Sequence, residues 1–235
     1  VNHMYTQLND LQQNLNKEML NKTEVVNKLL KNIADLNKQI KIQESMGPHI
    51  KANDLRDMRN EDLDRLSELI PINYYENNKS EILVSLNGRS LVNEDYFNPL
   101  EIIMNEKGHG EIYFSDTGEK GGKIELGGLG ELGGYIDARD NDVVEYIDRL
   151  DILVGTLAEK INTIHKKGRG LDGEKNELDF FEFDSSNPSA TIKVNPALAD
   201  FNKIAASKSG DKGDGEIIKE ILESQTLPKD PSWLC

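Results

Sequence analysis

The sequence predicts an α+β protein: an elongated antiparallel rod of long, heptad-patterned helices with a small antiparallel β-hairpin subdomain. Three observations lead to this fold class. Apolar residues recur every 3.5 residues in two long segments, which is typical of helices that pack along a narrow seam. Between these segments the apolar residues alternate, which indicates strands. Only 37% of the 235 residues are hydrophobic and 30% are charged, which suits a molecule with a large surface.

The first forty-odd residues are predicted to form one helix. Eight of its ten heptad sites are apolar, and Gln12 and Lys22 are the exceptions. The apolar sites are Leu8, Leu15, Met19, Val26, Leu29, Ile33, Leu36 and Ile40. Gly47 and Pro48 end this helix, because proline cannot continue it. A second helix is expected from Asn53 to Ile70, with the Asn53 side chain as its N-cap.

Residues 71–129 are predicted to form the β subdomain. The segment ILVSLNGRSLV contains two alternating runs joined by Asn87-Gly88, a sequence typical of a type I′ hairpin turn, which needs positive φ twice. LEIIM and EIYFS predict a second hairpin, and GGKIEL predicts one more strand.

A heptad pattern returns over residues 136–164, where eight of nine sites are apolar. It predicts one uninterrupted helix of about thirty residues, roughly 45 Å long. The sequence His165-Lys166-Lys167-Gly168 marks its end, with cations at the negative end of the helix dipole and glycine at the cap. We expect the seams of this helix and the first helix to pack on each other, with Leu150 and Leu157 both buried.

The rest of the chain is predicted to complete the rod. We expect short strands at DFFEF and ATIKV and a last helix from Glu216 to about Ser224. The expected organisation is a cloning remnant at 1–4, rod helices at 5–70, the β subdomain at 71–129, the long rod helix at 130–168, the completing segments at 169–228 and an added tail with Cys235 at 229–235.

The net charge of −14 argues against nucleic acid and membrane partners, since phosphates and anionic lipids attract concentrated Lys and Arg. No segment approaches the roughly twenty apolar residues of a membrane span, and no cleavable signal peptide is visible. Cys235 is the only cysteine. This fits the cytosol, and it fits equally an export route that avoids oxidising compartments.

The segment GGLGELGG contains a G-x-G-x-x-G motif at Gly128, Gly130 and Gly133. A dinucleotide-binding fingerprint needs a βαβ unit with an acidic residue at the end of the second strand, about twenty residues on. Here those twenty residues are predicted helix, so Asp148 and Asp151 would lie in mid-helix. The segment is therefore predicted to be a turn from a strand into a helix.

Other candidate sites also favour structural roles. Carboxylates at the start of the long helix complement its dipole. They are Asp137, Asp140, Asp142 and Glu145. GDKGDGEIIKE lacks oxygen ligands at calcium-loop positions, and we expect His49, His109 and His165 to be ordinary surface residues. No serine stands in a nucleophile elbow. The expectation is a non-enzyme with no catalytic residues, no cofactor, no metal and no small-molecule substrate.

Four stretches, in this order, resemble the flagellar hook-associated protein 1 family of hook–filament junction proteins. They are VVNKLLKNIADLNKQI (25–40), ANDLRDMRNEDLDRLSEL (52–69), GELGGYIDARDNDVVEYIDRLDILVGTLAEKINTIHKKGRGLDG (130–173) and VNPALADFNKIAAS (194–207). The third is the most specific. Residues that the resemblance marks as fold signature are Asn53, Asp54, Arg56, Arg59, Gly133, Gly134, Asp137, Arg139 and Asp140; Asn60 stands where the family usually has an acid.

The resemblance implies a structural subunit of the extracellular flagellum, exported by the flagellar type III system. It implies contacts with the hook protein and the second junction protein, self-assembly into a ring, and an export chaperone that binds a C-terminal part not in this sequence. The chain resembles a central portion that lacks the terminal polymerisation segments. The alternative is a bacterial surface adhesin with a coiled-coil stalk and a β tip, in which the seams would drive self-association.

Overall fold

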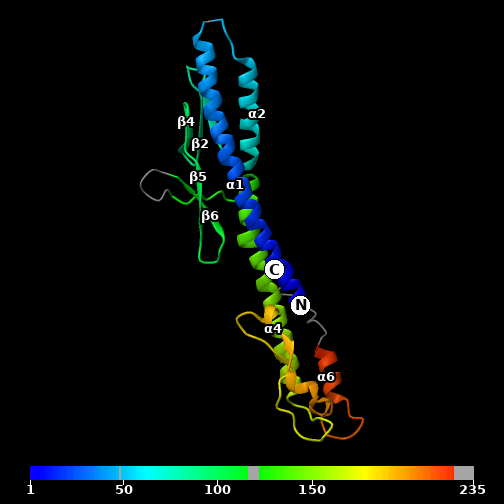
Figure 1. The fold of residues 1–235 in the computed structure, drawn as a ribbon. Coiled ribbons are helices and arrows are strands. Elements are labelled where there is room, and N and C mark those ends of the chain that lie inside the picture. Colours follow the sequence, from blue (N-terminus) through cyan, green and yellow to red (C-terminus); the bar gives the residue numbers. More distant parts are fainter. Residues whose placement is uncertain (48, 116–121, 225–235) are drawn as a thin grey trace. The chain divides into compact units, whose positions relative to one another are not determined.

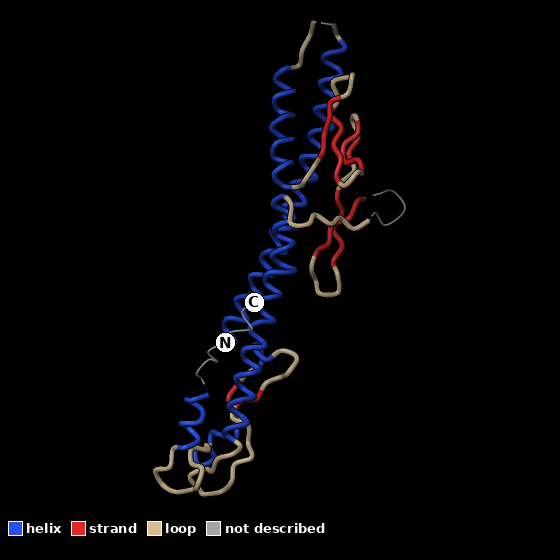
Figure 2. The backbone as a smooth tube through the Cα atoms, turned by 180° about the vertical axis from the view of Figure 1, so that it is seen from behind, coloured by secondary structure: helices blue, strands red, loops and turns tan. Residues whose placement is uncertain are grey.

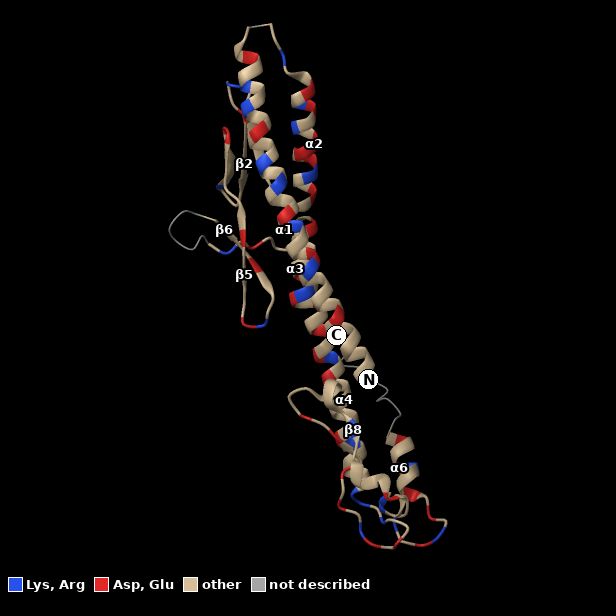
Figure 3. Ribbon diagram, viewed as in Figure 1, with Lys and Arg blue, Asp and Glu red and all other residues tan. Residues whose placement is uncertain are grey.

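The computed structural model describes residues 1–47, 49–115 and 122–224, and it contains long helices and small antiparallel sheets (Figures 1 and 2). The predicted α+β class is thereby confirmed. The chain divides into two compact units. We call residues 10–143 the β-sheet unit and residues 1–9 with 144–235 the α4 unit. Acidic and basic residues occur along the helices of both (Figure 3).

Two helices begin the chain, close to where the apolar pattern places them. Helix α1 spans Asn2–Ser45 and contributes its first residues to the α4 unit and the rest to the β-sheet unit. Helix α2 spans Asn53–Leu69. In the view of Figure 1, α1 lies between α2 and the strands.

The core of the β-sheet unit corrects the packing expected of the α1 seam. Met19, Val26 and Ile33 lie in one buried cluster with residues of α2, of the strands and of α3. Of the predicted long-helix seam, only Ile136 packs at the margin of this cluster. The α1 seam is therefore buried mainly by α2, the strands and α3.

Among the described residues of the β-sheet unit, six strands form two antiparallel sheets. The first has the order β1 (Asn73–Glu76), β2 (Ile82–Leu86), β3 (Arg89–Asn93), β4 (Tyr96–Phe97), and the second pairs β5 (Leu100–Met104) with β6 (Gly110–Phe114). Both predicted hairpins are confirmed.

The predicted turn chemistry is confirmed, but the predicted strand at GGKIEL is wrong. Asn87 and Gly88 have φ of 51° and 79°, as a type I′ turn requires. In the described part of GGKIEL, residues 122–126, Lys123 forms an isolated bridge to Tyr113 and no regular strand is present. The apolar alternation in this segment arises because Ile124 and Leu126 enter the core while the chain leaves the sheet.

The long helix is a run of three pieces rather than one uninterrupted α-helix. Helix α3 (Gly130–Asp137) is followed by a π-helical turn, η1 (Ala138–Asp142), and by α4 (Val143–His165). The predicted end at His165 is confirmed. Gly168 does not adopt positive φ as a cap; a Cβ there would lie 2.8 Å from the Ala205 Cβ, so close packing requires the glycine.

The α4 unit surrounds α4 with short elements. They are β7 (Phe181–Glu182), α5 (Pro188–Thr191), β8 (Lys193–Val194), the 3-10 helices η2 (Pro196–Ala199) and η3 (Phe201–Lys203), and α6 (Glu216–Ser224). The predicted strands are present but shorter, and the predicted last helix is confirmed. The expected tail at 229–235 lies outside the described residues. None of the described helices is long and apolar enough to cross a membrane.

Candidate functional site

The glycine-rich segment GGLGELGG is the turn by which the chain enters α3. Gly127, Gly128 and Gly130 have φ of 57°, 73° and 69°, a region that favours glycine. A Cβ on Gly130 would lie 2.6 Å from the carbonyl oxygen of Leu69, at the end of α2. One on Gly133 would lie 2.9 Å from the carbonyl carbon of Gly128. The predicted turn into a helix is confirmed, although no regular strand precedes it, and it packs directly on the end of α2.

Two further signature residues of this segment have different surroundings. Gly134 is exposed, and a Cβ added there would meet nothing within 4 Å. The carboxylate of Asp137 lies beside Gly128 and accepts a hydrogen bond from Asn141 Nδ2 at 2.5 Å. The space next to the glycine turn is therefore occupied by the chain's own negative charge.

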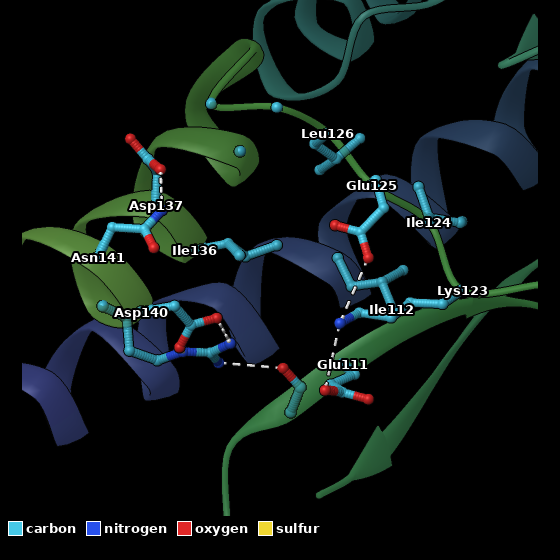
Figure 4. A pocket seen from close by; sticks show the side chains of 15 residues that line it. Glu111, Ile112, Lys123, Ile124, Glu125, Leu126, Ile136, Asp137, Asp140 and Asn141 are labelled. Carbon is cyan, nitrogen blue, oxygen red and sulfur yellow. Dashed lines mark hydrogen bonds and ion pairs between the residues drawn. The ribbon is translucent and has the colours of Figure 1, made fainter. Parts of the chain in front are cut away.

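A cavity of about 230 Å³ lies beside this turn (Figure 4). Its charged lining includes Glu111, Glu125, Asp137 and Asp140. Lys123 forms ion pairs with Glu111 and Glu125, each at 3.3 Å. Hydrogen bonds from Tyr113 and Lys123 lower the pKa of Glu111. The lining is net acidic and largely paired with itself, the opposite of what a phosphate group needs.

Arg139 is the centre of the contacts below this cavity, and only 1% of it is exposed. Its Nε and Nη2 donate to the two carboxylate oxygens of Asp140, each at 2.8 Å. Its Nη1 donates to Asn16 Oδ1 at 2.6 Å and to the carbonyl of Gly110 at 3.0 Å. Arg139 thus connects η1, α1 and β6, and the resulting network holds each partner in one geometry.

The π-helical turn around Arg139 is supported by α1. Gln12 Nε2 donates to the carbonyl oxygen of Arg139 at 2.9 Å. Gln12 is one of the polar exceptions in the predicted seam, and this bond explains its place there. Burial raises the pKa of Asp140, but the Arg139 guanidinium outweighs it and holds that pKa below its usual range. The Asp140 carboxylate also lies 3.5 Å from His109 Nδ1.

Two further arginines, Arg56 and Arg59, lie at the other end of the β-sheet unit. Arg56 donates from Nε and Nη2 to the two oxygens of Glu44, at 2.8 and 3.0 Å, and from Nη1 to Glu76 at 2.7 Å. Its hydrogen bonds lower the pKa of Glu44 to about 2. Arg59 is buried and donates from Nη1 to Asn37 Oδ1 at 2.9 Å and to the Ser80 carbonyl at 2.7 Å. The pair ties α2 to α1 and to the β1–β2 connection.

The predicted N-cap role of Asn53 is wrong. The N-cap position of α2 is Ala52, and no side chain of α2 caps it. The backbone N–H of Ala52 instead donates to Glu44 Oε1 at 3.1 Å. A carboxylate from the end of α1 therefore satisfies a group at the start of α2, which leaves Asn53 exposed in the first turn. Asp54 is exposed beside it, where its charge complements the helix dipole.

Asparagines of α1, which the sequence pattern does not identify, connect the helix to the strands; Asn37 is buried and Asn27 is half-buried. Asn37 Nδ2 donates to the carbonyl of Ile82 at 2.8 Å, and its Oδ1 accepts from the N–H of Ile82 at 2.9 Å. Asn27 forms the same pair of bonds with Leu100, at 2.9 and 2.7 Å. Each amide side chain acts as a peptide group would in a neighbouring strand. We call these residues the peptide-mimicking asparagines.

Two other residues complete this group. Asn16 Oδ1 accepts from the N–H of Gly110 at 2.9 Å, and on α4 Asn162 pairs with the N–H and carbonyl of Phe181 at 2.8 and 2.9 Å. The one sequence signal is spacing. Residues 16, 27 and 37 are about three helical turns apart and so share a side of α1.

His165 corrects the expectation of a surface histidine. Only 1% of it is exposed. Its Nε2 accepts from the N–H of Ala205 at 3.0 Å, which leaves Nδ1 to donate to the Leu178 carbonyl 2.9 Å away. Its imidazole joins the end of α4 to two later loops. The sequence does not indicate this role, because a histidine at a helix end is usually exposed. His49 is exposed, as expected, and His109 is half-buried beside Asp140.

Leu157 corrects the predicted seam of the long helix. It is 44% exposed and, with Leu153, lines an apolar groove of about 330 Å³ in the α4 unit, whereas Leu150 is 8% exposed and Ala158 is fully buried. An α-helix drifts about 20° per heptad relative to a 3.5-residue repeat. At this turn the buried position is 158 rather than 157, while Val154, Ile161 and Ile164 of the predicted seam are buried.

The loop before α6 is held together by hydrogen bonds to the carboxylate of Asp214. The Asp214 carboxylate accepts from the backbone N–H groups of Lys208, Ser209 and Glu216 at 2.8, 2.8 and 3.0 Å. These bonds, with those from the Ser209 and Ser207 hydroxyls, lower its pKa. Within the described residues no group of three or more His, Cys, Asp or Glu side chains could hold a metal ion.

Comparisons with known proteins give one consistent result. Residues 1–181 match the family described as the flagellar hook-associated protein FlgK helical domain. The chain is 26% identical over 194 residues to flagellar hook-associated protein 1 of Salmonella typhimurium, covering 77% of this chain and 35% of that protein. It is 27% identical over 161 residues to the Escherichia coli protein of the same name, covering 66% and 29%.

The fold is similar to that of a solved structure, the flagellar hook junction protein FlgK from Burkholderia pseudomallei. The TM-score is 0.64 at 22% sequence identity, and the match covers 76% of this chain and 33% of that one. The chain spans about a third of the length of the curated relatives that it matches.

Proposed function

Because the chain belongs to the FlgK family of flagellar hook-associated proteins, we propose that it is a structural subunit that joins the flagellar hook to the filament, without catalysis. The observation that carries the proposal is the family match over residues 1–181, which includes the whole β-sheet unit and α4. The comparisons name flagellar proteins only and give no support to the adhesin alternative.

The contacts of the β-sheet unit support a mechanical role. A subunit between two different polymers has to keep its shape under bending and torsion. Arg59 and Arg139 are buried and each joins segments far apart in the sequence. The peptide-mimicking asparagines add bonds with fixed direction between α1 and the strands. Polar networks of this kind specify one packing more strictly than apolar contacts do.

The proposed partners are the hook protein on one side and the second hook–filament junction protein on the other, with identical subunits in a ring. Export through the flagellar type III system, with a chaperone bound to a C-terminal part outside this sequence, belongs to the same proposal. The composition is compatible with it, since a chain with one cysteine needs no internal disulfide.

The proposal is tested by removing the gene that encodes the chain from its own bacterium. Cells should then carry hooks without filaments and release flagellin into the medium, and a plasmid copy should restore filaments. Electron microscopy with an antibody against the chain should label the hook–filament boundary. Normal filaments with reduced adherence to surfaces would favour the adhesin and contradict the junction.

A further inference from the structure

The exposed side of α2 carries a line of five carboxylates, which we call the acidic stripe; one exposed arginine, Arg65, lies at its edge. Its members follow at alternating three- and four-residue spacing, so they lie one above another on the helix. They are Asp54, Asp57, Glu61, Asp64 and Glu68, all exposed. None forms an ion pair or a side-chain hydrogen bond with another described residue. Like charges at this spacing destabilise a helix, so the acidic stripe is unfavourable while it faces only water.

The exposed side of α1 carries the opposite charge, in what we call the lysine stripe. Its members are Lys17, Lys28, Lys31 and Lys38, all exposed and none in an ion pair with a described residue. Residues 17 and 28 are three turns apart, and residues 31 and 38 are two turns apart. Glu24 and Asp35 lie on the same side, so four lysines stand against two carboxylates and the stripe is net positive.

We propose that the acidic stripe of one chain docks on the lysine stripe of a second copy. This rests on the proposed function, because a ring of identical subunits is heterologous: each copy presents one face to the neighbour on one side and a different face to the other. At 1.5 Å per residue the acidic stripe is about 21 Å long and the lysine stripe about 31 Å. The two stripes are therefore of comparable length and opposite charge.

The net charge of −14 opposes the approach of two copies. The contact is weak between free chains and gains strength where other contacts already hold subunits side by side. This also makes the proposal distinguishable from a simple effect of net charge. Replacing acids by lysines on the acidic stripe lowers the net negative charge, which by itself favours association, yet it removes the docking surface.

A zero-length carbodiimide cross-linker provides the test, because it joins a lysine amine to a carboxylate only where the two are in contact. Equal amounts of normal and ¹⁵N-labelled chain are mixed at a few hundred micromolar in low salt, and mass spectrometry identifies links between chains. The expected product joins Glu61 to Lys31 of the other copy or to its neighbours in the lysine stripe. Absence of inter-chain links between the two stripes would refute the proposal.

Charge reversals next to Glu61 and Lys31 test whether attraction between opposite charges holds the two stripes together. The double variant Asp57→Lys, Asp64→Lys leaves Glu61 in place and should reduce the inter-chain link about ten-fold, since each facing pair contributes a few tenths to 1 kcal/mol and 1.4 kcal/mol is ten-fold. Lys28→Glu with Lys38→Glu should do the same. Combining all four reversals should restore the link.

The matched control is Glu101→Lys with Glu106→Lys, two exposed residues of the same unit that change the net charge equally but lie off both stripes. It should keep the link at the original level or above. If the stripe variant links as well as this control, the docking surface is refuted. The junction role is judged separately by filament attachment, so this failure leaves that result untouched.

Discussion

Replacing Asn37 by leucine removes a fully satisfied buried amide with little change in volume. Its Nδ2 donates to the carbonyls of Ile82 and Glu94, both at 2.8 Å. Its Oδ1 accepts from Ile82 N–H and from Arg59 Nη1, both at 2.9 Å. The amide therefore uses both of its donors and both acceptor sites. Asn37→Leu leaves four protein groups without this partner.

The four groups do not contribute equally to the expected loss. Ile82 is only 4% exposed, and each unsatisfied buried backbone group costs about 1–3 kcal/mol. Arg59 Nη1 keeps its bond to Ser80, and Glu94 is half-buried and can reach water. The leucine recovers about 1 kcal/mol by apolar burial. The free energy of unfolding should fall by about 3 kcal/mol, a large share of the 5–15 kcal/mol typical of a domain.

Urea-dependent hydrogen exchange of peptides from residues 82–97 measures this loss within the β-sheet unit. Asn21→Leu is the matched control, because Asn21 is exposed on the same helix, and it should change the free energy by less than about 0.5 kcal/mol. A loss below about 1 kcal/mol for Asn37→Leu would refute the reasoning, since it would mean that the Ile82 groups find other partners.

Three further predictions concern the glycine turn, the seam of the long helix and the response to acid. Gly133→Ala should cost about 1–3 kcal/mol, because its Cβ would meet backbone 2.9 Å away, whereas Gly134→Ala, in open space, should stabilise by up to about 1 kcal/mol in thermal unfolding. Leu150→Asp should cost at least about 3 kcal/mol and Leu157→Asp less than about 1 kcal/mol by urea denaturation; equal losses would contradict the drift of the buried side. The pKa of Glu44 is lowered from 4.5 to about 2, so its contribution to stability is complete above pH 4.5 and is lost as pH falls towards 2. Glu44→Gln should make the urea midpoint less dependent on pH across that window. An unchanged pH dependence would show that this carboxylate does not cause the loss of stability in acid.

Elements whose signals are local could be predicted from the sequence. The turn at Asn87-Gly88 depends on two positive φ values that only a few residue types adopt readily. Helix α6 is bounded by its own polar loop and its own apolar period. The glycine turn can be predicted because the residues after it have the pattern of a helix. In each case the information lies within about ten residues.

Features that depend on distant partners could not be predicted. The π-helical turn is supported by Gln12, which the heptad pattern marks only as a polar exception. The burial of His165 depends on loops that follow it in the sequence. Strand β1 is exposed throughout, so it lacks the alternation by which strands are recognised. The fold-signature residues are identified by resemblance alone, because their contacts depend on the tertiary structure.

The peptide-mimicking asparagines of α1 also bear on the order of folding. Asn37 bonds a residue 45 positions away, Asn27 one 73 positions away and Asn16 one 94 positions away. These contacts are nested: each encloses the previous one. Once the innermost has formed, the next closes a far shorter effective loop than its sequence separation implies, and the entropy of closure falls accordingly. The β-sheet unit can therefore form its contacts in sequence, from the α1–α2 turn outward. In this order each long-range contact costs about as much closure entropy as a local contact would.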